Sequence, residues 1–262
     1  MSPGDRASGA GRVVRGGVAP APVPADVGIV AAMSMEVGYL VDQLRRVRKY
    51  HAASIPVIEG ELGGKIVAIA LGGMGRKSAR LATSILLDGH RPSWVISAGF
   101  AGALSHSLNR YDVILPAEVI DLEGQRYSID RPSSISGLGS EPRTLATVDR
   151  VILDAAEKRR LHEETGADLV DMETSAVAEI CARRLVRFLS VRVVSDDARS
   201  DLPREVASLI SKTGSYRIGA ALRAIWNRPS SVKDFWSLQE QALEAADRLA
   251  TFLVRCLSEL PA

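Results

Sequence analysis

Residues 26–44 read DVGIVAAMSMEVGYLVDQL, and they set a pattern that the rest of the chain repeats. The apolar run Val27–Ala32 has the length and composition of a β-strand that is buried on both faces. From Met33 to Leu44 the apolar residues change to helical spacing and form one stripe. The stripe consists of Val37, Leu40, Val41 and Leu44. This stretch therefore predicts a buried strand that leads directly into an amphipathic helix.

The same alternation of strands and helices continues along the chain. Further strands are expected at Ile55–Glu59, Lys65–Leu71, Trp94–Ala98, Asp112–Ile120, Asp168–Val170 and Phe188–Val194. Further helices are expected at Lys77–Asp88, Val151–Glu163, Glu173–Arg183, Glu205–Trp226 and Val232–Leu257. Such alternation favours a parallel sheet that is covered by helices on both faces. We therefore expect the α/β class, as a single-domain three-layer α/β/α fold with a mostly parallel central mixed sheet.

Composition divides the chain into a tail and one domain. The chain has 262 residues, of which 46% are hydrophobic, and this is enough for one buried core. Residues 1–25 are predicted to be a disordered N-terminal tail, because they are rich in Gly, Pro, Ala and Arg and show no period. The domain is expected to span 26–262 and to end in an extended helical C-terminus. The Ser/Gly/Pro-rich segment Arg131–Arg143 predicts either a mobile lid or a disordered excursion.

Charge and cysteine content argue against several classes of protein. The net charge is +2 and no long basic run occurs, so neither nucleic acid nor an anionic membrane is expected as a partner. No apolar stretch has the length of a membrane span. Cys181 and Cys256 are interpreted as reduced thiols on apolar helix faces, which fits a cytoplasmic protein. The sequence has no metal-ligand cluster and no dinucleotide-binding motif, so no cofactor is expected.

Several strand ends carry residues that are suited to chemistry. Glu36 follows the first strand, the Gly-rich segments 72–75 and 99–102 follow two others, Glu173 follows a short strand, and Asp196 ends the last central strand. Taken singly, each is explained as a helix-dipole partner, a cap or a tight turn. In parallel sheets, however, ligands bind at the carboxyl ends of strands. Three carboxylates gathered there would raise one another's pKa, which is typical of acid–base sites.

Five sequence blocks, taken in order, resemble the purine and uridine phosphorylase superfamily. They are GIVAAMSMEV, LGGMGRKSA, ISAGFAGAL, VDMETSAVA and VRVVSDDA. Within this superfamily, the chain is most similar to the methylthioadenosine/S-adenosylhomocysteine nucleosidases. The resemblance covers about residues 26–200, and its specific part is VDMET and VRVVSDDA, since Gly-rich blocks alone occur widely. It implies a nucleoside phosphorylase-like fold and, by analogy, a homodimer.

The resemblance implies a catalytic role for two residues. Glu36 matches the carboxylate that orients and deprotonates the attacking water in the nucleosidases. Asp196 matches the general acid that protonates N7 of the departing purine, and Ser195 matches a hydroxyl that helps to position this acid. The chemistry requires such groups, because water is a poor nucleophile and a purine departs more easily once it is protonated. The two carboxyl groups must therefore have environments that separate their pKa values.

The resemblance also implies a set of substrate-binding residues. Met172 and Glu173 match the positions that bind ribose, where the Glu accepts from the 2′- and 3′-hydroxyl groups. Arg192 matches an arginine that supports this Glu and the water. The remaining positions assigned to substrate binding, in the two Gly-rich turns, are Gly73, Phe100 and Gly102.

The choice between hydrolysis and phosphorolysis depends on anion binding. The phosphorylases hold phosphate with an Arg and a Ser around the central GxxG turn, and the matching positions here are Ser97 and Phe100. Loss of the guanidinium removes the group best suited to bidentate phosphate contact, so water is the expected acceptor. Arg76 and Lys77 keep phosphate binding open as an alternative, because they lie near a Gly-rich turn.

The expected base-stacking aromatic is missing, because the matching region is Asp149-Arg150. Phe100 replaces a small residue and either narrows the pocket or stacks on the ligand. We therefore expect an N-ribosyl hydrolase that cleaves the glycosidic bond of a purine nucleoside, with 5′-methylthioadenosine, S-adenosylhomocysteine or another 5′-modified adenosine as the small-molecule substrate. The alternatives are a phosphate-dependent nucleoside phosphorylase and, from another class, a non-catalytic nucleoside-binding protein.

Overall fold

The buried run at the start of the domain forms β1 (Val27–Ala31), near the centre of a mixed sheet. It pairs in parallel with β4 (Lys65–Leu71) on one side and with β5 (Trp94–Ala103) on the other. The free side of β5 pairs in parallel with β11 (Arg187–Asp196) along its whole length. These four strands are the parallel centre that the apolar runs predict.

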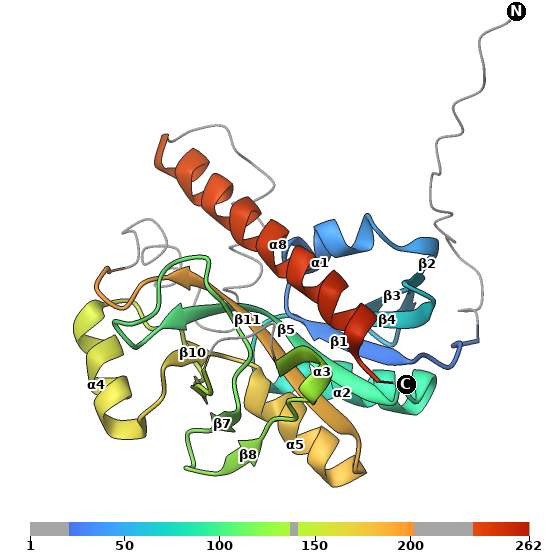
Figure 1. Cartoon of the computed structure of the whole chain (residues 1–262), viewed down its shortest axis with the longest axis horizontal. Coiled ribbons are helices and arrows are strands. Elements are labelled where there is room, and N and C mark those ends of the chain that lie inside the picture. The colour runs from blue at the N-terminus through green and yellow to red at the C-terminus, as the bar shows by residue number, and fades with distance from the viewer. Residues whose placement is uncertain (1–20, 137–140, 202–232, 262) are drawn as a thin grey trace, which may run out of the picture.

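The computed structural model describes residues 21–136, 141–201 and 233–261, and its sheet has the strand order β2-β3-β4-β1-β5-β10-β9-β7-β8 (Figure 1). The remaining strands are β2 (Arg45–Ala52), β3 (Ile55–Leu62), β6 (Val113–Ile114), β7 (Glu118–Ile120), β8 (Arg126–Ser128), β9 (Thr144–Thr147) and β10 (Leu169–Asp171). A second parallel block joins β10, β9 and β7. Antiparallel pairings add β2 and β3 at one margin and β8 at the other, and they also join β10 to β5 and β6 to β11.

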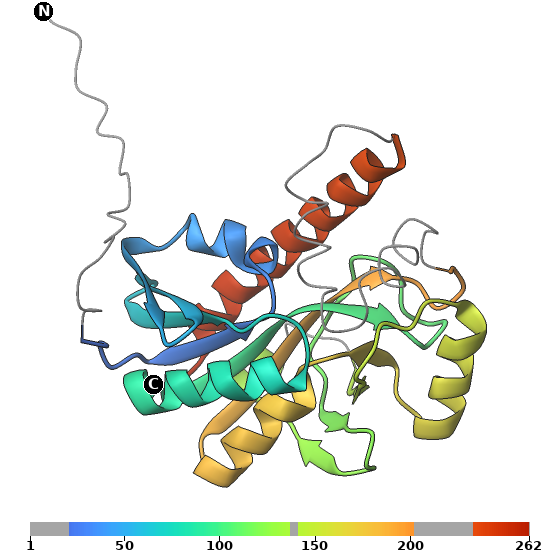
Figure 2. The same cartoon turned by 180° about the vertical axis from the view of Figure 1, so that it is seen from behind.

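Helices cover both faces of this sheet, as Figures 1 and 2 show from opposite sides. One face carries α1 (Ser34–Val41) and α8 (Lys233–Glu259), and the other carries α2 (Arg76–His90) and α5 (Thr174–Arg184). Two further helices are α3 (Ser133–Ser136) and α4 (Ala155–Thr165). The single-domain α/β/α fold is therefore confirmed, with a mixed sheet as its middle layer.

Strand β1 shows why the central strands are apolar throughout. Val27 and Ile29 pack into the core on the α1 and α8 side, whereas Val30 packs into the core on the α2 and α5 side. Successive side chains of a strand point to opposite faces, so a strand between two helical layers must be apolar at every position. Gly28 allows the backbone to lie against Pro92, whose Cγ would be 3.0 Å from an added Cβ.

The sheet differs from the prediction at its margins. The sequence of β2, RRVRKYHA, carries alternating exposed charges, which protect an edge strand from unwanted pairing but hide its strand character. The strand expected at Asp112–Ile120 is divided into β6 and β7, and Pro116, which cannot donate to a ladder, lies between them. The strand expected to end at Ala98 continues through the Gly-rich segment to Ala103.

The packed chain begins before the predicted boundary. Residues 1–20 of the expected tail lie outside the described residues, but residues 21–25 are held against the domain. The N–H of Ala25 donates to the carbonyl oxygen of His90 at 2.9 Å, and the His90 ring contacts the carbonyl oxygen of Val23 at 2.8 Å. The tail predicted as 1–25 is therefore too long at its C-terminal end.

Two other predictions concern segments that are described only in part. The predicted loop Arg131–Arg143 contains the short helix α3, and residues 137–140 lie outside the described residues. The helix expected at Glu205–Trp226 also lies outside them. The last predicted helix, Val232–Leu257, corresponds to α8. Among the helices that are described, none has both the length and the hydropathy of a membrane span.

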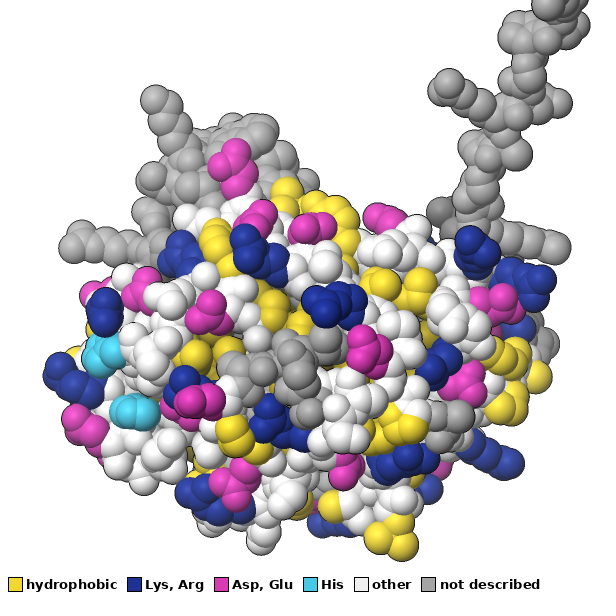
Figure 3. All heavy atoms as spheres, in the orientation of Figure 1, with side chains coloured by type: hydrophobic (Ala, Val, Ile, Leu, Met, Phe, Trp, Pro, Cys, Tyr) yellow, Lys and Arg dark blue, Asp and Glu magenta, His cyan; other side chains and the backbone are white. Residues whose placement is uncertain are grey.

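Charged side chains are spread over the surface. On the face seen in Figure 3, Lys and Arg side chains alternate with Asp and Glu side chains. Over the whole surface, exposed ion pairs include Arg46–Glu61 and Arg184–Asp88. This surface agrees with the small net charge of the chain, +2.

The packing of α8 generates a stability prediction. Leu253 is fully buried between α8, α1 and the sheet. Leu253→Ala is expected to lower the free energy of unfolding by about 2–5 kcal/mol, because it leaves a cavity in a close-packed core. Leu243→Ala on the same helix is the matched control, since Leu243 is 36% exposed and its truncation should cost less than about 1 kcal/mol. Urea unfolding measures both, and equal midpoints would show that α8 is not part of the core.

Candidate active site

Glu36 lies in the first turn of α1 and turns back towards the strand that precedes it. Its Oε2 accepts from the backbone N–H groups of Ala32 at 3.0 Å and Met33 at 2.8 Å, and its Oε1 accepts from the N–H of Phe100 at 3.1 Å. Burial raises the pKa of the Glu36 carboxyl group, although these three N–H groups and Arg192 oppose the shift. The result is a fixed carboxyl group that binds a proton more readily than an ordinary glutamate.

Gly99 makes room for this carboxylate on β5. A Cβ at position 99 would lie 2.6 Å from Glu36 Oε1 and 2.9 Å from Arg192 Nη1. Both distances are too short for any side chain, so the glycine is required for the close approach of two charged groups to the backbone. The Gly-rich turn of the sequence is thus part of a strand, and its function is to leave space.

Glu173 lies at the start of α5 and reaches across to the turn after β4. Its Oε1 accepts from the N–H of Gly75 at 2.6 Å, and Gly73 and Gly75 both have the positive φ that glycine tolerates. Burial and the charge of Asp171 raise the pKa of Glu173 to about 8. Glu173 is therefore largely protonated at neutral pH in the protein as it stands.

Arg192 supplies a buried positive charge beneath these carboxyl groups. Its Nη2 lies 2.6 Å from Ser97 Oγ, 2.8 Å from Asp171 Oδ2 and 2.6 Å from Thr174 Oγ1. Asp171 in turn accepts from the hydroxyl of Thr147 at 2.7 Å and from the N–H of Thr174 at 3.0 Å. The hydrogen bonds of Arg192 thus hold Asp171 and the start of α5, rather than Glu173 directly as the sequence comparison implies.

Asp196 and Ser195 lie at the end of β11, where the ladder with β5 is irregular. The register shifts between Val194 and Asp196, so that Ser195 is an extra residue in the strand. Ser195 Oγ lies 2.7 Å from Asp196 Oδ1 and 3.2 Å from the carbonyl oxygen of Ala101. Such a bulge redirects side chains at a strand end, and here it brings both residues to the same cavity.

Lys158 of α4 approaches Asp196 from the other side. Its Nζ lies 2.6 Å from Asp196 Oδ2, and it donates to the carbonyl oxygens of Asp197 at 2.6 Å and Ser200 at 3.1 Å. Its side chain is fully buried. Sequence reasoning does not single out this lysine, because α4 is mostly polar and its burial is visible only in the structure.

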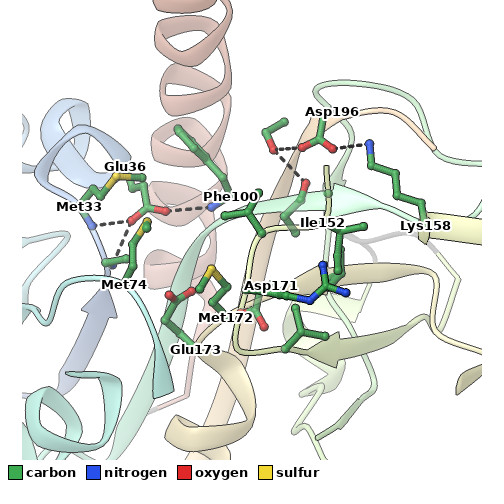
Figure 4. Close-up of a pocket in the computed structure, with 18 residues that line it drawn as sticks. Met33, Glu36, Met74, Phe100, Ile152, Lys158, Asp171, Met172, Glu173 and Asp196 are labelled. Carbon is green, nitrogen blue, oxygen red and sulfur yellow. Dashed lines mark hydrogen bonds and ion pairs between the residues drawn. The ribbon is translucent and has the colours of Figure 1, made fainter. Parts of the chain in front are cut away.

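These side chains surround one cavity of about 260 Å³. Figure 4 shows Glu36 on one side of it and Asp196 with Lys158 on the other, with Met172 and Glu173 along the floor. Of the predicted site residues, seven line this cavity: Glu36, Phe100, Gly102, Met172, Glu173, Ser195 and Asp196. Gly102 must be small here, since an added Cβ would lie 3.1 Å from Asp196 Oδ2. The wall is otherwise mainly apolar and includes Met33, Met74, Val148, Val151 and Ile152.

A second, much smaller cavity adjoins the first. It has a volume of about 10 Å³ and is lined by Glu36, Glu173, Arg192, Gly73 and Ser97, among others. It therefore contains the last two predicted site residues, Gly73 and Arg192, and it shares Glu36 and Glu173 with the main cavity. A polar space of this volume suits about one water molecule.

The two basic residues that kept phosphate binding open do not face a free anion site. Arg76 is paired with Glu123 at 2.8 Å and with Asp149 at 2.9 Å, and Lys77 is exposed on the first turn of α2. The charge of Arg76 is thus already balanced by two carboxylates. Arg150, at the position of the missing aromatic, lines the main cavity and is paired with Glu157.

No cluster of His, Cys, Asp and Glu suited to a metal ion occurs among the residues that the structure describes. The main cavity brings together three carboxyl groups, those of Glu36, Glu173 and Asp196, within a mainly apolar wall. This arrangement is typical of enzymes that move protons on and off a small organic substrate.

A comparison with family models assigns the chain to a known family. The chain belongs to the phosphorylase superfamily, whose model matches residues 26–143 and 137–258. Among its relatives, it is 27% identical over 216 residues to the 5′-methylthioadenosine/S-adenosylhomocysteine nucleosidase of Shewanella loihica, covering 72% of this chain and 94% of that protein. The nucleosidase of Shewanella oneidensis is 29% identical, also over 216 residues, with coverage of 72% and 91%.

Solved structures show the same fold. The nucleosidase of Neisseria meningitidis in complex with methylthio-immucillin-A superposes with a TM-score of 0.70 at 20% identity, covering 89% of this chain and 99% of that one. The enzyme from Streptococcus pneumoniae, with a transition-state inhibitor, gives the same TM-score and identity, with coverage of 90% and 99%.

The raised pKa of Glu173 generates a prediction about stability. The folded protein retains a proton on Glu173 up to about pH 8, whereas the unfolded chain loses it near 4.5. The unfolded state therefore binds fewer protons between these values, and this group makes the protein less stable as pH rises through that window. Glu173→Gln removes the effect, so the variant should gain stability relative to wild type between pH 5 and 8, by up to about 1.4 kcal/mol per pH unit.

Urea unfolding of both proteins at pH 5, 6, 7 and 8 measures this difference. A constant difference across the series would mean that Glu173 is ionised in the folded protein. Glu61→Gln serves as a control, since Glu61 lies in an exposed ion pair with Arg46 far along the sheet.

Proposed function

We propose that the chain is an N-ribosyl hydrolase that cleaves the glycosidic bond of a purine nucleoside with water, and that 5′-methylthioadenosine and S-adenosylhomocysteine are its favoured substrates. The observation that carries this proposal is the position of Glu36 and Asp196 on opposite sides of one cavity, with Glu173 between them. A nucleoside whose base faces Asp196 and whose sugar lies over Met172 would present its C1′ towards Glu36. The names of the relatives supply the choice of substrate.

The reaction assigns one proton movement to each end of the cavity. Asp196 gives a proton to N7 of the base, while the electron pair of the C1′–N9 bond moves onto the departing purine. The oxygen of a water molecule bonds to C1′, and Glu36 takes the proton that this water loses. Positive charge that develops on the sugar is stabilised by the surrounding carboxyl groups.

The environment of each group suits its role. Glu36 is held by three N–H groups that favour its ionised form, while burial raises its pKa towards the range in which a base is effective. Glu173 can use its carboxyl group to bind the 2′- and 3′-hydroxyl groups of ribose, and the Gly75 N–H fixes its orientation.

Water is favoured over phosphate as the acceptor. The small cavity beside Glu36 has a volume of about 10 Å³, which is room for about one water molecule and too little for a phosphate ion. Ser97 already accepts a hydrogen bond from Arg192, and Arg76 is already paired with Glu123 and Asp149. These contacts leave no cationic fork for phosphate among the described residues of the site.

Recognition of the purine base and the oligomeric state are proposed by analogy with the nucleosidases. Arg150 lines the cavity where the nucleosidases have an aromatic residue, and a planar guanidinium group can stack on a purine. We also propose a cytoplasmic homodimer, which rests on the resemblance to the nucleosidases alone.

The test is a base-release assay on a panel of nucleosides, with and without phosphate. Wild type should release adenine from 5′-methylthioadenosine at the same rate in both buffers. Asp196→Asn and Glu36→Gln should each lower kcat by about 10²–10⁴-fold, because each removes one proton transfer. Glu173→Gln should mainly raise KM, since its amide still binds a diol but less strongly than the carboxyl group.

Three outcomes would contradict the proposal. Phosphate-dependent turnover would make the chain a phosphorylase, and tight binding without any product would make it a nucleoside-binding protein. Wild-type rates in both Asp196→Asn and Glu36→Gln would show that the site is wrong. Arg76→Gln is the control and should keep the wild-type rate in both buffers.

A further inference from the structure

Lys158 is a buried cation that the reaction described above does not use. A buried ammonium group is costly unless it is paired and its donors are satisfied. Lys158 meets both conditions, with three acceptors around Nζ: Asp196 Oδ2, and the carbonyl oxygens of Asp197 and Ser200. The two carbonyl oxygens carry no charge, and hydrogen bonds to them would be enough to hold α4 against the end of β11. The third is the side chain that the proposed reaction needs as its acid.

The remaining charged groups around Asp196 do not replace this cation. Glu36 and Glu173 face it across the cavity and are acidic. The other cations that line the two cavities are Arg192, which is paired with Asp171, and Arg150, which is paired with Glu157. The segment that follows Asp196 also carries Asp197, Arg199 and Asp201. The Asp197 carboxylate accepts from the N–H of Arg199 and from the Ser200 hydroxyl, Asp201 accepts from the N–H of Ala155, and the Arg199 side chain is exposed. Among the described residues, Lys158 is therefore the cation in direct contact with Asp196.

The two oxygens of Asp196 are held by different partners. Ser195 contacts Oδ1 at 2.7 Å, and Lys158 contacts Oδ2 at 2.6 Å. The plane of the carboxyl group is thus held by one contact from β11 and one from α4. A proton on Asp196 then has a fixed direction, which is a requirement for efficient transfer to a substrate atom.

We propose that Lys158 is a positioning residue that makes Asp196 a stronger acid. When the Asp196 O–H bond breaks and the proton joins N7 of the base, a carboxylate forms in a cavity that already holds two acidic groups. Lys158 stabilises this carboxylate and keeps all of its own protons, so it contributes most when the negative charge appears. The proposal rests on the proposed function, and it concerns the strength of the acid.

A stronger acid has two opposite consequences. Proton transfer to the base becomes more favourable, so the rate at low pH is higher. The protonated fraction of Asp196 falls at a lower pH, so activity is lost earlier as the solution becomes alkaline. Lys158 therefore sets the upper end of the pH range in which the enzyme releases base.

The experiment is the pH profile of kcat and kcat/KM for Lys158→Gln and Lys158→Arg. The Gln side chain can still donate to the carbonyl oxygens of Asp197 and Ser200 but carries no charge. The basic limb of the pH profile of Lys158→Gln should move to higher pH by about one unit or more, because an opposite charge at this distance lowers the pKa of a carboxyl group by that amount. Its kcat on the low-pH plateau should fall about tenfold, with KM nearly unchanged. Lys158→Arg keeps the charge and should keep the wild-type limb.

Arg159→Gln is the matched control, because Arg159 is exposed on the same helix and its variant should have the wild-type profile. All variants are assayed below their own melting temperatures. An unshifted basic limb in Lys158→Gln would overturn the proposal while leaving the proposed function intact, provided that wild type releases base and Asp196→Asn does not. If Lys158→Gln does not fold, Lys158→Arg provides the test. A shift of its basic limb to higher pH would overturn the proposal, because the positive charge is retained in this variant.

Discussion

The close approach of Glu36 to β5 is the constraint on which the site depends. The carboxylate can accept from the Phe100 N–H only because residue 99 has no side chain, and Arg192 uses the same gap. The pairing of β5 with β11 then fixes the rest, since it places Arg192 opposite Gly99 and Asp196 opposite Gly102. Two glycines on one strand therefore decide where three charged groups lie.

Charge balance explains why so many acidic groups can share one cavity. Arg192 neutralises Asp171 beneath the floor, and Lys158 neutralises Asp196 at the far end. Glu36 and Glu173 lack an ion-pair partner of their own among the described residues, and burial raises the pKa of both carboxyl groups. The site thus combines two carboxyl groups that are paired with buried cations and two that are not.

The sequence predicts the centre of this molecule better than its margins. The apolar runs of β1, β5 and β11 are visible because those strands are buried on both faces, and the motifs at the ends of β1, β10 and β11 indicate Glu36, Glu173 and Asp196. Strand β2 is hidden by its Arg and Lys residues, since an edge strand needs no apolar pattern. Lys158 is missed for a related reason: lysine on a polar helix is ordinarily solvated, and only the fold shows that this one points inward. The partners of Arg192 are likewise set by three-dimensional contacts that no spacing encodes.

The extra residue at Ser195 gives β11 an unusual sensitivity to length. A regular strand would turn residues 195 and 196 to opposite faces, and the bulge is what lets both meet the cavity. Deleting one residue here would restore an even ladder and leave the hydrophobic interior nearly intact, yet it would rotate the acid out of place. Insertions and deletions at the end of this strand would therefore separate folding from activity: a chain altered there can be well folded and inert.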